Sequence, residues 1–315
     1  MKKLTALFLA VLMLTACTAK NTENTATQEG YPVTVKNYDR EVTVNKTPEK
    51  VLTLGPNCTE LFVALGLGDK IAGTSLKNHS RGPLPEYAEI YKDIPEMNYG
   101  SATREAVISS GADFIYGIDW EFGESNLDIA ELKSYGMSVY KNSATTVDEQ
   151  YREILDIGKL FGIKETAQKY VDDQKSRISA VGDKVKNLDK PNVLVYDSGN
   201  DGVFTCSGIN FESQLISLAG GKNIFDDLKD KQWVTVSYEE IIKRKPDVIV
   251  IHDYDSPSVE EKIAEIKANK VLSQLDCVKN ERFVVIDLES VLPGNRIAYT
   301  VEKLSKGFFS DKKEE

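Results

Sequence analysis

The sequence is poor in metal-binding and in basic residues. Among its 315 residues are only two histidines, His79 and His252, and four cysteines. Zinc and manganese sites usually draw several ligands from these residue types, so we do not expect direct capture of a bare divalent cation. Acidic residues outnumber lysine and arginine by 49 to 39, for a formal net charge of −10. This balance argues against nucleic acid as a partner, because phosphates require clustered lysine and arginine.

The common signatures of catalysis are also missing. The sequence has no Gly-x-Ser-x-Gly, no phosphate-binding P-loop, no Gly-x-Gly-x-x-Gly after a strand and no His-Glu-x-x-His. Paired acids such as Glu239-Glu240 and Asp226-Asp227 are typical of a solvated surface. We therefore expect a protein that is not an enzyme and holds no cofactor. A surface enzyme of unknown activity is the alternative of another class.

Long hydrophobic runs are absent except at the N-terminus. Residues 4–14 are apolar and follow two lysines, but this run is too short to span a bilayer and is typical of a signal peptide. It ends in Leu-Thr-Ala-Cys at Cys17, which resembles the lipobox of bacterial lipoproteins. We expect a signal peptide at 1–16, lipidation of Cys17 and a flexible polar tether at 17–30. The protein would then be anchored to the cell membrane facing outside, extracellular in a Gram-positive cell and periplasmic otherwise.

Three cysteines remain in the mature chain: Cys58, Cys206 and Cys277. Their number is odd, so at most one disulfide can form. Their wide spacing fits no zinc pattern, and we expect them to be small buried apolar residues.

The body of the chain contains what looks like an internal duplication, and its length favours two domains. REAVISSGADFIYGI at 104–118 matches YEEIIKRKPDVIVIH at 238–252. Each reads as a short amphipathic helix, a turn and a hydrophobic strand. Continuous β-branched runs such as 248–251 suit parallel strands that are covered on both faces. The pattern predicts two α/β lobes with central parallel sheets.

A long helical stretch separates the two halves. Residues 146–149 have capping-box spacing, and the apolar residues of 164–188 fall on one helical stripe. Such a helix would be roughly 35 Å long and would hold the lobes nearly fixed. We therefore expect lobes at 31–144 and 190–309, a helical linker at 145–189 and a charged tail at 310–315.

The order and spacing of these segments resemble the helical-backbone class (class III) of ABC-transporter substrate-binding proteins, which carry ferric siderophores, haem and cobalamin. The resemblance covers roughly Tyr31 to Phe309. It rests on the lipobox, KVLTLGPNCTELFVALGLGDKIAG, REAVISSGADFIYG, the long mid-chain helix, WVTVSYEEIIKRKPDVIVI, and VLSQLDCVKNERFVVI with Pro293-Gly-Asn-Arg296 after it.

This resemblance implies two Rossmann-like lobes with a ligand cleft between them. It implies a monomer that delivers its ligand to an ABC permease dimer with separate ATPase subunits. The expected ligand is a ferric chelate, a siderophore before a corrinoid and a corrinoid before haem.

Open α/β sheets bind ligands beyond the carboxyl ends of their strands, so residues just after predicted strands are candidates for the cleft. In the first lobe the candidates are Asn57, Thr59, Arg81, Tyr99, Trp120 and Glu121. In the second lobe they are Thr205 and Ser207 in a small polar loop, Trp233, Asp253, Tyr254 and Arg296. Arg296 is the preferred cation for an anionic ligand, because guanidinium binds oxyanions bidentately. His252 or Tyr254 is an alternative ligand for haem or a metal.

By the same resemblance, one glutamate on each lobe contacts arginines of the permease. Glu105 and Glu239 occupy the same place in the duplicated unit, with Glu240 as the local rival of Glu239. The alternative is that each is a first-turn carboxylate favoured by the helix dipole.

Overall fold

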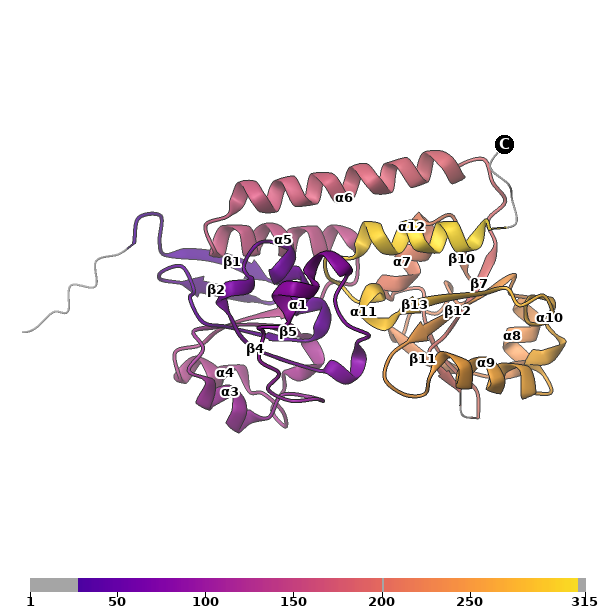
Figure 1. The fold of residues 1–315 in the computed structure, drawn as a ribbon, viewed down its shortest axis with the longest axis horizontal. Coiled ribbons are helices and arrows are strands. Elements are labelled where there is room, and N and C mark those ends of the chain that lie inside the picture. The colour runs from indigo at the N-terminus through magenta and orange to yellow at the C-terminus, as the bar shows by residue number, and fades with distance from the viewer. Residues whose placement is uncertain (1–27, 200, 311–315) are drawn as a thin grey trace, which may run out of the picture.

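The computed structural model describes residues 28–199 and 201–310 (Figure 1). The expected signal peptide, Cys17, most of the tether and residues 311–315 of the tail lie outside these ranges. None of the helices within them is both long enough and apolar enough to cross a membrane.

The N-terminal lobe is built on a parallel sheet with the order β4-β3-β5-β6. Its strands are β3 (Val51–Leu54), β4 (Ile71–Ser75), β5 (Phe114–Ile118) and β6 (Ser138–Asn142). Strands β3 and β5 are buried along their whole length, as expected for strands covered on both faces. One face packs on α1 (Pro56–Ala64) and α5 (Val147–Leu160), and the other on α3 (Arg104–Ser110) and α4 (Ile129–Ser134).

The C-terminal lobe repeats this arrangement with the order β10-β7-β12-β13, again parallel. Its strands are β7 (Asn192–Tyr196), β10 (Lys222–Asn223), β12 (Val248–Asp253) and β13 (Phe283–Asp287). Its helices include α7 (Phe211–Leu218), α8 (Tyr238–Arg244), α9 (Val259–Ala268), α10 (Asp276–Lys279) and α11 (Leu288–Val291). In both lobes the second strand along the chain flanks the first, and the third and fourth follow on the other side. The shared order supports the internal duplication.

Two antiparallel additions were not predicted. A hairpin of β1 (Val33–Asn37) and β2 (Arg40–Val44) joins the first lobe. In the second lobe β8 (Ser198–Gly199), β9 (Val203–Cys206) and β11 (Trp233–Val236) form a small antiparallel sheet. The polar loop expected around Thr205 is therefore wrong at that residue, because Thr205 pairs with Val234 inside this sheet. A short helix α2 (Ala88–Tyr91) completes the first lobe.

The expected linker contains the predicted long helix as α6 (Lys164–Val185), and the separate helix α5 precedes it. Helix α5 begins with the predicted capping box of Thr146 and Glu149. The chain then turns at Gly162, whose φ of 71° favours glycine. Helix α6 (Lys164–Val185) runs above both lobes, with α5 beneath it on one side and α12 (Ile297–Phe308) on the other (Figure 1).

Polar contacts fasten α6 to the C-terminal end of the chain. Arg177 donates two hydrogen bonds to Glu302, of 2.9 and 2.6 Å. The Gln174 side chain accepts from the amide of Ala298 at 2.9 Å. Beneath these contacts one continuous apolar core runs from Phe62 in the first lobe to Val250 in the second. A common core of this kind makes the two lobes one packed unit.

A buried ion pair also joins the lobes directly. Arg296, just before α12, donates to both carboxylate oxygens of Glu60 on α1, at 2.7 and 2.5 Å. Asn295 donates a further hydrogen bond of 2.7 Å to Glu60. Arg296 is 4% exposed and Glu60 is 1% exposed, so water does not screen the pair.

A second buried carboxyl group, that of Glu289, lies at the same contact between the two lobes. Glu289 on α11 accepts hydrogen bonds from the Ser80 hydroxyl and the Arg81 amide of the first lobe, at 2.8 and 3.0 Å. Its Oε2 atom is buried and has no partner among the described residues. Burial raises the pKa of Glu289 to about 6, and nearby Arg296 only partly offsets this effect.

The three cysteines Cys58, Cys206 and Cys277 are free and buried, which confirms their expected character as small core residues.

Removal of Glu60 should destabilise the protein strongly. Glu60→Ala leaves the Arg296 guanidinium buried without its partner, and we expect a loss of about 3–5 kcal/mol in the free energy of unfolding in urea. The double variant Glu60→Leu with Arg296→Met should lose much less, because neither charge remains. Glu89→Ala, which removes an exposed pair with Lys92, is the matched control. An equal loss in the single and double variants would contradict this account of the pair.

Glu289 should make stability depend on pH. Because its pKa is raised from 4.5 to about 6 on folding, its favourable contribution is full below about pH 4.5 and is lost as pH rises through about 6. Glu289→Gln mimics the protonated form. Relative to wild type, this variant should therefore gain about 2 kcal/mol between pH 4.5 and pH 7. Urea unfolding at both pH values measures the gain, and the exposed Glu86→Gln should show none.

Candidate ligand-binding site

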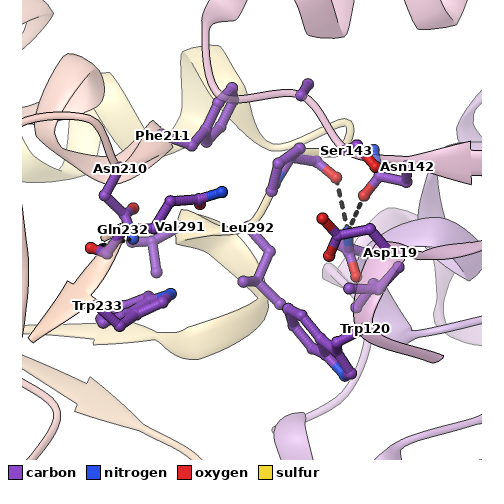
Figure 2. Close-up of a pocket in the computed structure, with 14 residues that line it drawn as sticks. Asp119, Trp120, Asn142, Ser143, Asn210, Phe211, Gln232, Trp233, Val291 and Leu292 are labelled. Atoms are coloured by element: carbon purple, nitrogen blue, oxygen red, sulfur yellow. Dashed lines mark hydrogen bonds between the residues drawn. The ribbon is translucent and has the colours of Figure 1, made fainter. Parts of the chain in front are cut away.

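A pocket of about 350 Å³ lies between the two lobes (Figure 2). Its volume is at the lower end of the range for small-molecule sites. The first lobe contributes Asn57, Ile118, Asp119, Trp120, Asn142, Ser143 and Ala144. The second lobe contributes Asn210, Phe211, Gln232, Trp233, Val291, Leu292 and Pro293.

The wall from the first lobe follows from the direction of its strands. Parallel strands β5 and β6 end at the same edge of the sheet, which places Asp119, Trp120 and Asn142 side by side. Asn57 reaches this edge from the first turn of α1, directly after β3.

The wall from the second lobe is built differently. Trp233 begins the inserted strand β11, where it pairs with Cys206 of β9. Asn210 is the N-cap of α7 and accepts a 2.9 Å hydrogen bond from the Glu212 amide. The inserted strand β11 and the N-terminus of α7 therefore supply part of this wall, and Val291 at the end of α11 with Leu292 and Pro293 after it supply the rest.

The chain has two tryptophans, and both line this pocket from opposite lobes (Figure 2). Trp233 stacks on Phe204 at 5.6 Å between ring centroids and meets the edge of His252 at 5.8 Å. Trp120 is 44% exposed and lies 6.3 Å from the ring of His79. The neighbouring rings hold each indole in place while part of it stays open to a ligand.

A hydrogen-bonded chain fixes the polar side of the pocket. The Asn57 amide donates to the carbonyl of Pro293 at 2.6 Å and to Asn142 at 3.1 Å. Asn142 in turn donates to Glu153 of α5 at 2.9 Å. These contacts join α1, β6 and α5 to Pro293 in the segment Val291–Pro293, which runs from the end of α11 toward α12 (the crossing segment), so the wall is ordered without ligand.

The pocket carries little charge. Among its fourteen lining residues, all of which the structure describes, there is no lysine, arginine or histidine, and Asp119 is the one ionisable side chain. Burial raises the pKa of Asp119, while Lys141 and hydrogen bonds, including one from Ser143, lower it in part.

His252 does not serve as a ligand to haem or metal. It is fully buried, with Nδ1 2.9 Å from Asp197 and Nε2 3.0 Å from Glu212. Burial by itself would lower its pKa, but the carboxylates of Glu212 and Asp197 raise it to about 9. At neutral pH the imidazolium therefore uses both nitrogens within the protein, and it supports Trp233 from behind.

Three of the twelve predicted ligand-binding residues line the pocket: Asn57, Trp120 and Trp233. Four others lie buried behind its walls, each 2% exposed or less: Thr59, Glu121, Thr205 and Ser207. Thr59 is bonded to Thr53 at 2.9 Å, and Glu121 accepts from the Ala102 amide at 2.9 Å. Their side chains build the walls and do not reach the cavity.

Four more predicted residues lie at the rim or outside it. Arg81 and Asp253 bond to each other across the lobes at 2.6 Å instead of facing the cavity. Tyr254 donates to Asp197 at 3.2 Å and covers the ammonium of Lys262 at 3.6 Å from its ring centroid. Tyr99 is 51% exposed and does not line the pocket.

The placement of Arg296 corrects the prediction most clearly. Its guanidinium is buried against Glu60 and also donates to Ser290 at 3.0 Å and to the carbonyl of Gly82 at 2.8 Å. With these partners it has no donor directed to the cavity. Arg296 therefore joins the lobes and is not the cation that meets an anionic ligand.

Sequence reasoning missed most of the lining. Asn142 is the last residue of β6 and Ser143 follows it directly, so the rule of residues after strands leads to Ser143 once the end of β6 is known. Asp119 directly precedes Trp120, which was predicted to line the cleft. Asn210, Gln232 and the segment Val291–Pro293 carry no local signal, because the inserted sheet and the crossing segment bring them to the pocket.

The two predicted docking glutamates occupy equivalent places in the structure. Glu105 and Glu239 are each the second residue of a helix, α3 or α8, and each helix leads into the third strand of its sheet. Both are exposed, and no hydrogen bond or ion pair ties either carboxylate to another described residue. Glu240 instead bonds to Arg244 at 2.9 Å.

Known proteins share this sequence pattern. Residues 51–289 match the family model described as periplasmic binding protein. The uncharacterized ABC transporter substrate-binding lipoprotein YvrC of Bacillus subtilis is 29% identical, over 97% of this chain and 96% of its own. The vitamin B12-binding protein of Yersinia pestis is 26% identical, over 64% of this chain and 69% of its own.

Solved structures share the fold. A periplasmic binding protein from Veillonella parvula aligns with a TM-score of 0.81 and 26% identity, over 89% of this chain and 99% of that one. A possible iron-binding, periplasmic solute-binding protein from Staphylococcus epidermidis aligns with a TM-score of 0.69 and 26% identity, over 84% and 100%. The chain therefore belongs to the periplasmic binding protein family, and its two-lobed fold with a helical backbone is that of the substrate-binding component of an ABC importer.

Proposed function

We propose that this protein is a monomeric lipoprotein, anchored through Cys17 on the outer side of the cell membrane, that captures a ferric siderophore and delivers it to an ABC permease. The observation that carries the proposal is the pair of indoles, Trp120 and Trp233, that face one pocket from opposite lobes. Aromatic walls of this kind suit a bulky organic chelate, because ring faces contact it over a large area at little entropic cost.

The charge of the pocket favours one type of siderophore. A ferric tricatecholate carries three negative charges, and haem carries two propionates; buried anions of this kind need cationic partners. The lining offers Asp119 and no cation. A ferric trihydroxamate has no net charge at its metal centre, and its carbonyl and amide groups can bond to the side chains of Asn142, Asn210 and Gln232.

A corrinoid is the second candidate. Its rim of uncharged amide arms would also match the amides of the lining, and the relative from Yersinia pestis is a vitamin B12-binding protein. A corrinoid is larger than a trihydroxamate, so the lobes would have to open further around a pocket of about 350 Å³. The contacts between α6 and α12 and the core shared by both lobes oppose such opening. This favours the smaller trihydroxamate chelate.

Delivery would use Glu105 and Glu239. A permease dimer presents two equivalent surfaces, and the duplicated lobes present two equivalent carboxylates. Since neither carboxylate has a partner within the described chain, both can pair with arginines of the permease. Hydrolysis of ATP would occur in other subunits, and the proposed role requires no catalysis by this chain.

Ligand titration tests the proposed substrate. Ferrichrome, an uncharged ferric trihydroxamate, should bind one per chain and quench the fluorescence of Trp120 and Trp233. Calorimetry and fluorescence measure binding, and the same titration into N-acetyltryptophanamide corrects for light absorption. A ferric tricatecholate and haemin should bind far more weakly. Binding of cyanocobalamin without ferrichrome would replace the first candidate with the second, and preference for haemin or the tricatecholate would contradict both.

Substitution of the docking glutamates tests delivery. Glu105→Ala with Glu239→Ala should leave the dissociation constant for the ligand unchanged and abolish its uptake by whole cells. Glu240→Gln is the matched control, because this neighbouring carboxylate is already bonded to Arg244, and uptake should persist. Lost binding in the double variant, or normal uptake, would refute the docking assignment.

A further inference from the structure

One charged group stands out in the pocket. Asp119 follows β5 directly, and its carboxylate projects into the space between the lobes beside Trp120 and Asn142 (Figure 2). It is half-buried, and no lysine or arginine is among the fourteen lining residues to neutralise it. A ligand that enters therefore meets one negative charge that no cation of the lining neutralises.

Two further carboxyl groups lie behind the same wall. Glu121 and Glu153 are both buried, and Glu153 accepts a 2.9 Å hydrogen bond from Asn142 of the lining. Burial is the first cause of the raised pKa of the neighbouring Cys58 thiol, and the charges of Glu153, Glu121 and Asp119 add to it. Lys141 is the cation that opposes Asp119 from this lobe.

The opposite wall does not cancel this negative charge. Its lining polar groups are the uncharged amides of Asn210 and Gln232. The cation behind it, His252, is bonded to two carboxylates. At the rim, the Arg81 guanidinium is bonded to Asp253 at 2.6 Å. Each of these cations is therefore neutralised locally, and the pocket as a whole attracts positive charge.

We propose that Asp119 selects a positively charged chelate: a ferric hydroxamate that bears an ammonium arm. The ammonium would donate a charge-assisted hydrogen bond to the Asp119 carboxylate and lie against an indole face, where a cation is attracted to the ring. Trp120 follows Asp119 in the chain and lines the same wall, so one ammonium can contact both. This inference rests on the proposed function and narrows its substrate class.

A pair of chelates that differ by one charge tests the proposal. Ferrioxamine B has an uncharged ferric trihydroxamate core and a free ammonium, and its N-acetylated derivative lacks the charge. By calorimetry, wild-type protein should bind ferrioxamine B about tenfold to a hundredfold more tightly, the usual value of a hydrogen bond to a charged group. The preference should shrink as salt is raised, because screening weakens it. Iron-free desferrioxamine B should bind weakly if the chelate core is recognised along with the ammonium.

Two variants locate the selectivity. Asp119→Asn should abolish the difference between the two ferrioxamines, and Glu124→Gln, which removes an exposed charge from the following loop outside the pocket, should keep it. The wild-type comparison needs no variant, so poor folding of Asp119→Asn would not obscure the result. Equal affinity of wild type for both ferrioxamines would overturn the role of Asp119 and leave the proposed function standing. Absence of binding to either chelate and to ferrichrome would overturn both. Tight binding of iron-free desferrioxamine B would show selection of the amine alone and contradict recognition of a chelate.

Discussion

The ion pair between Glu60 and Arg296 is the constraint on which the arrangement of the lobes depends. These residues lie 236 positions apart, and both are almost fully buried. A buried pair is costly unless its hydrogen bonds are satisfied, and here Asn295, Ser290 and the carbonyl of Gly82 complete the set. Any other placement of α1 against the start of α12 would leave one of these charges buried without its partner. The ion pair therefore favours the single arrangement that is observed. The segment that precedes Arg296 also crosses between the lobes and supplies part of the pocket.

The layer of helices α5, α6 and α12 holds the two lobes together along with the contact between Glu60 and Arg296. Helix α6 runs above both lobes, and the shared apolar core beneath it extends from one sheet to the other (Figure 1). Separating the lobes would expose part of that core to water and break the contacts between α6 and α12. Small rearrangements at the rim are thus less costly than a wide hinge motion. In a braced pocket little binding energy is lost in ordering the protein.

The two lobes repeat one topology, yet they contribute unlike walls to the pocket. The first wall is polar and acidic, with Asp119 in front of the buried carboxyl groups Glu121 and Glu153. The second is aromatic and uncharged, because the inserted sheet of β8, β9 and β11 places Trp233 over a buried and fully paired His252. The duplication thus preserves the scaffold and the paired positions of Glu105 and Glu239, while the insertion distinguishes the two sides of the site.

Local pattern in the sequence determined the elements. The buried strands β5 and β12, the capping box of α5 and the two equivalent helices were all predictable, because spacing and burial of neighbouring residues decide them. The strand-end rule also found Asn57 and Trp120, and Trp233 was predicted as a residue that could stack on a planar ligand. Tertiary structure alone decided which polar groups face the cavity. Arg296 and Glu60, and likewise Arg81 and Asp253, neutralise each other across the lobes. A charge takes the partner that folding brings within hydrogen-bonding distance, and that distance is set by packing rather than by position along the chain.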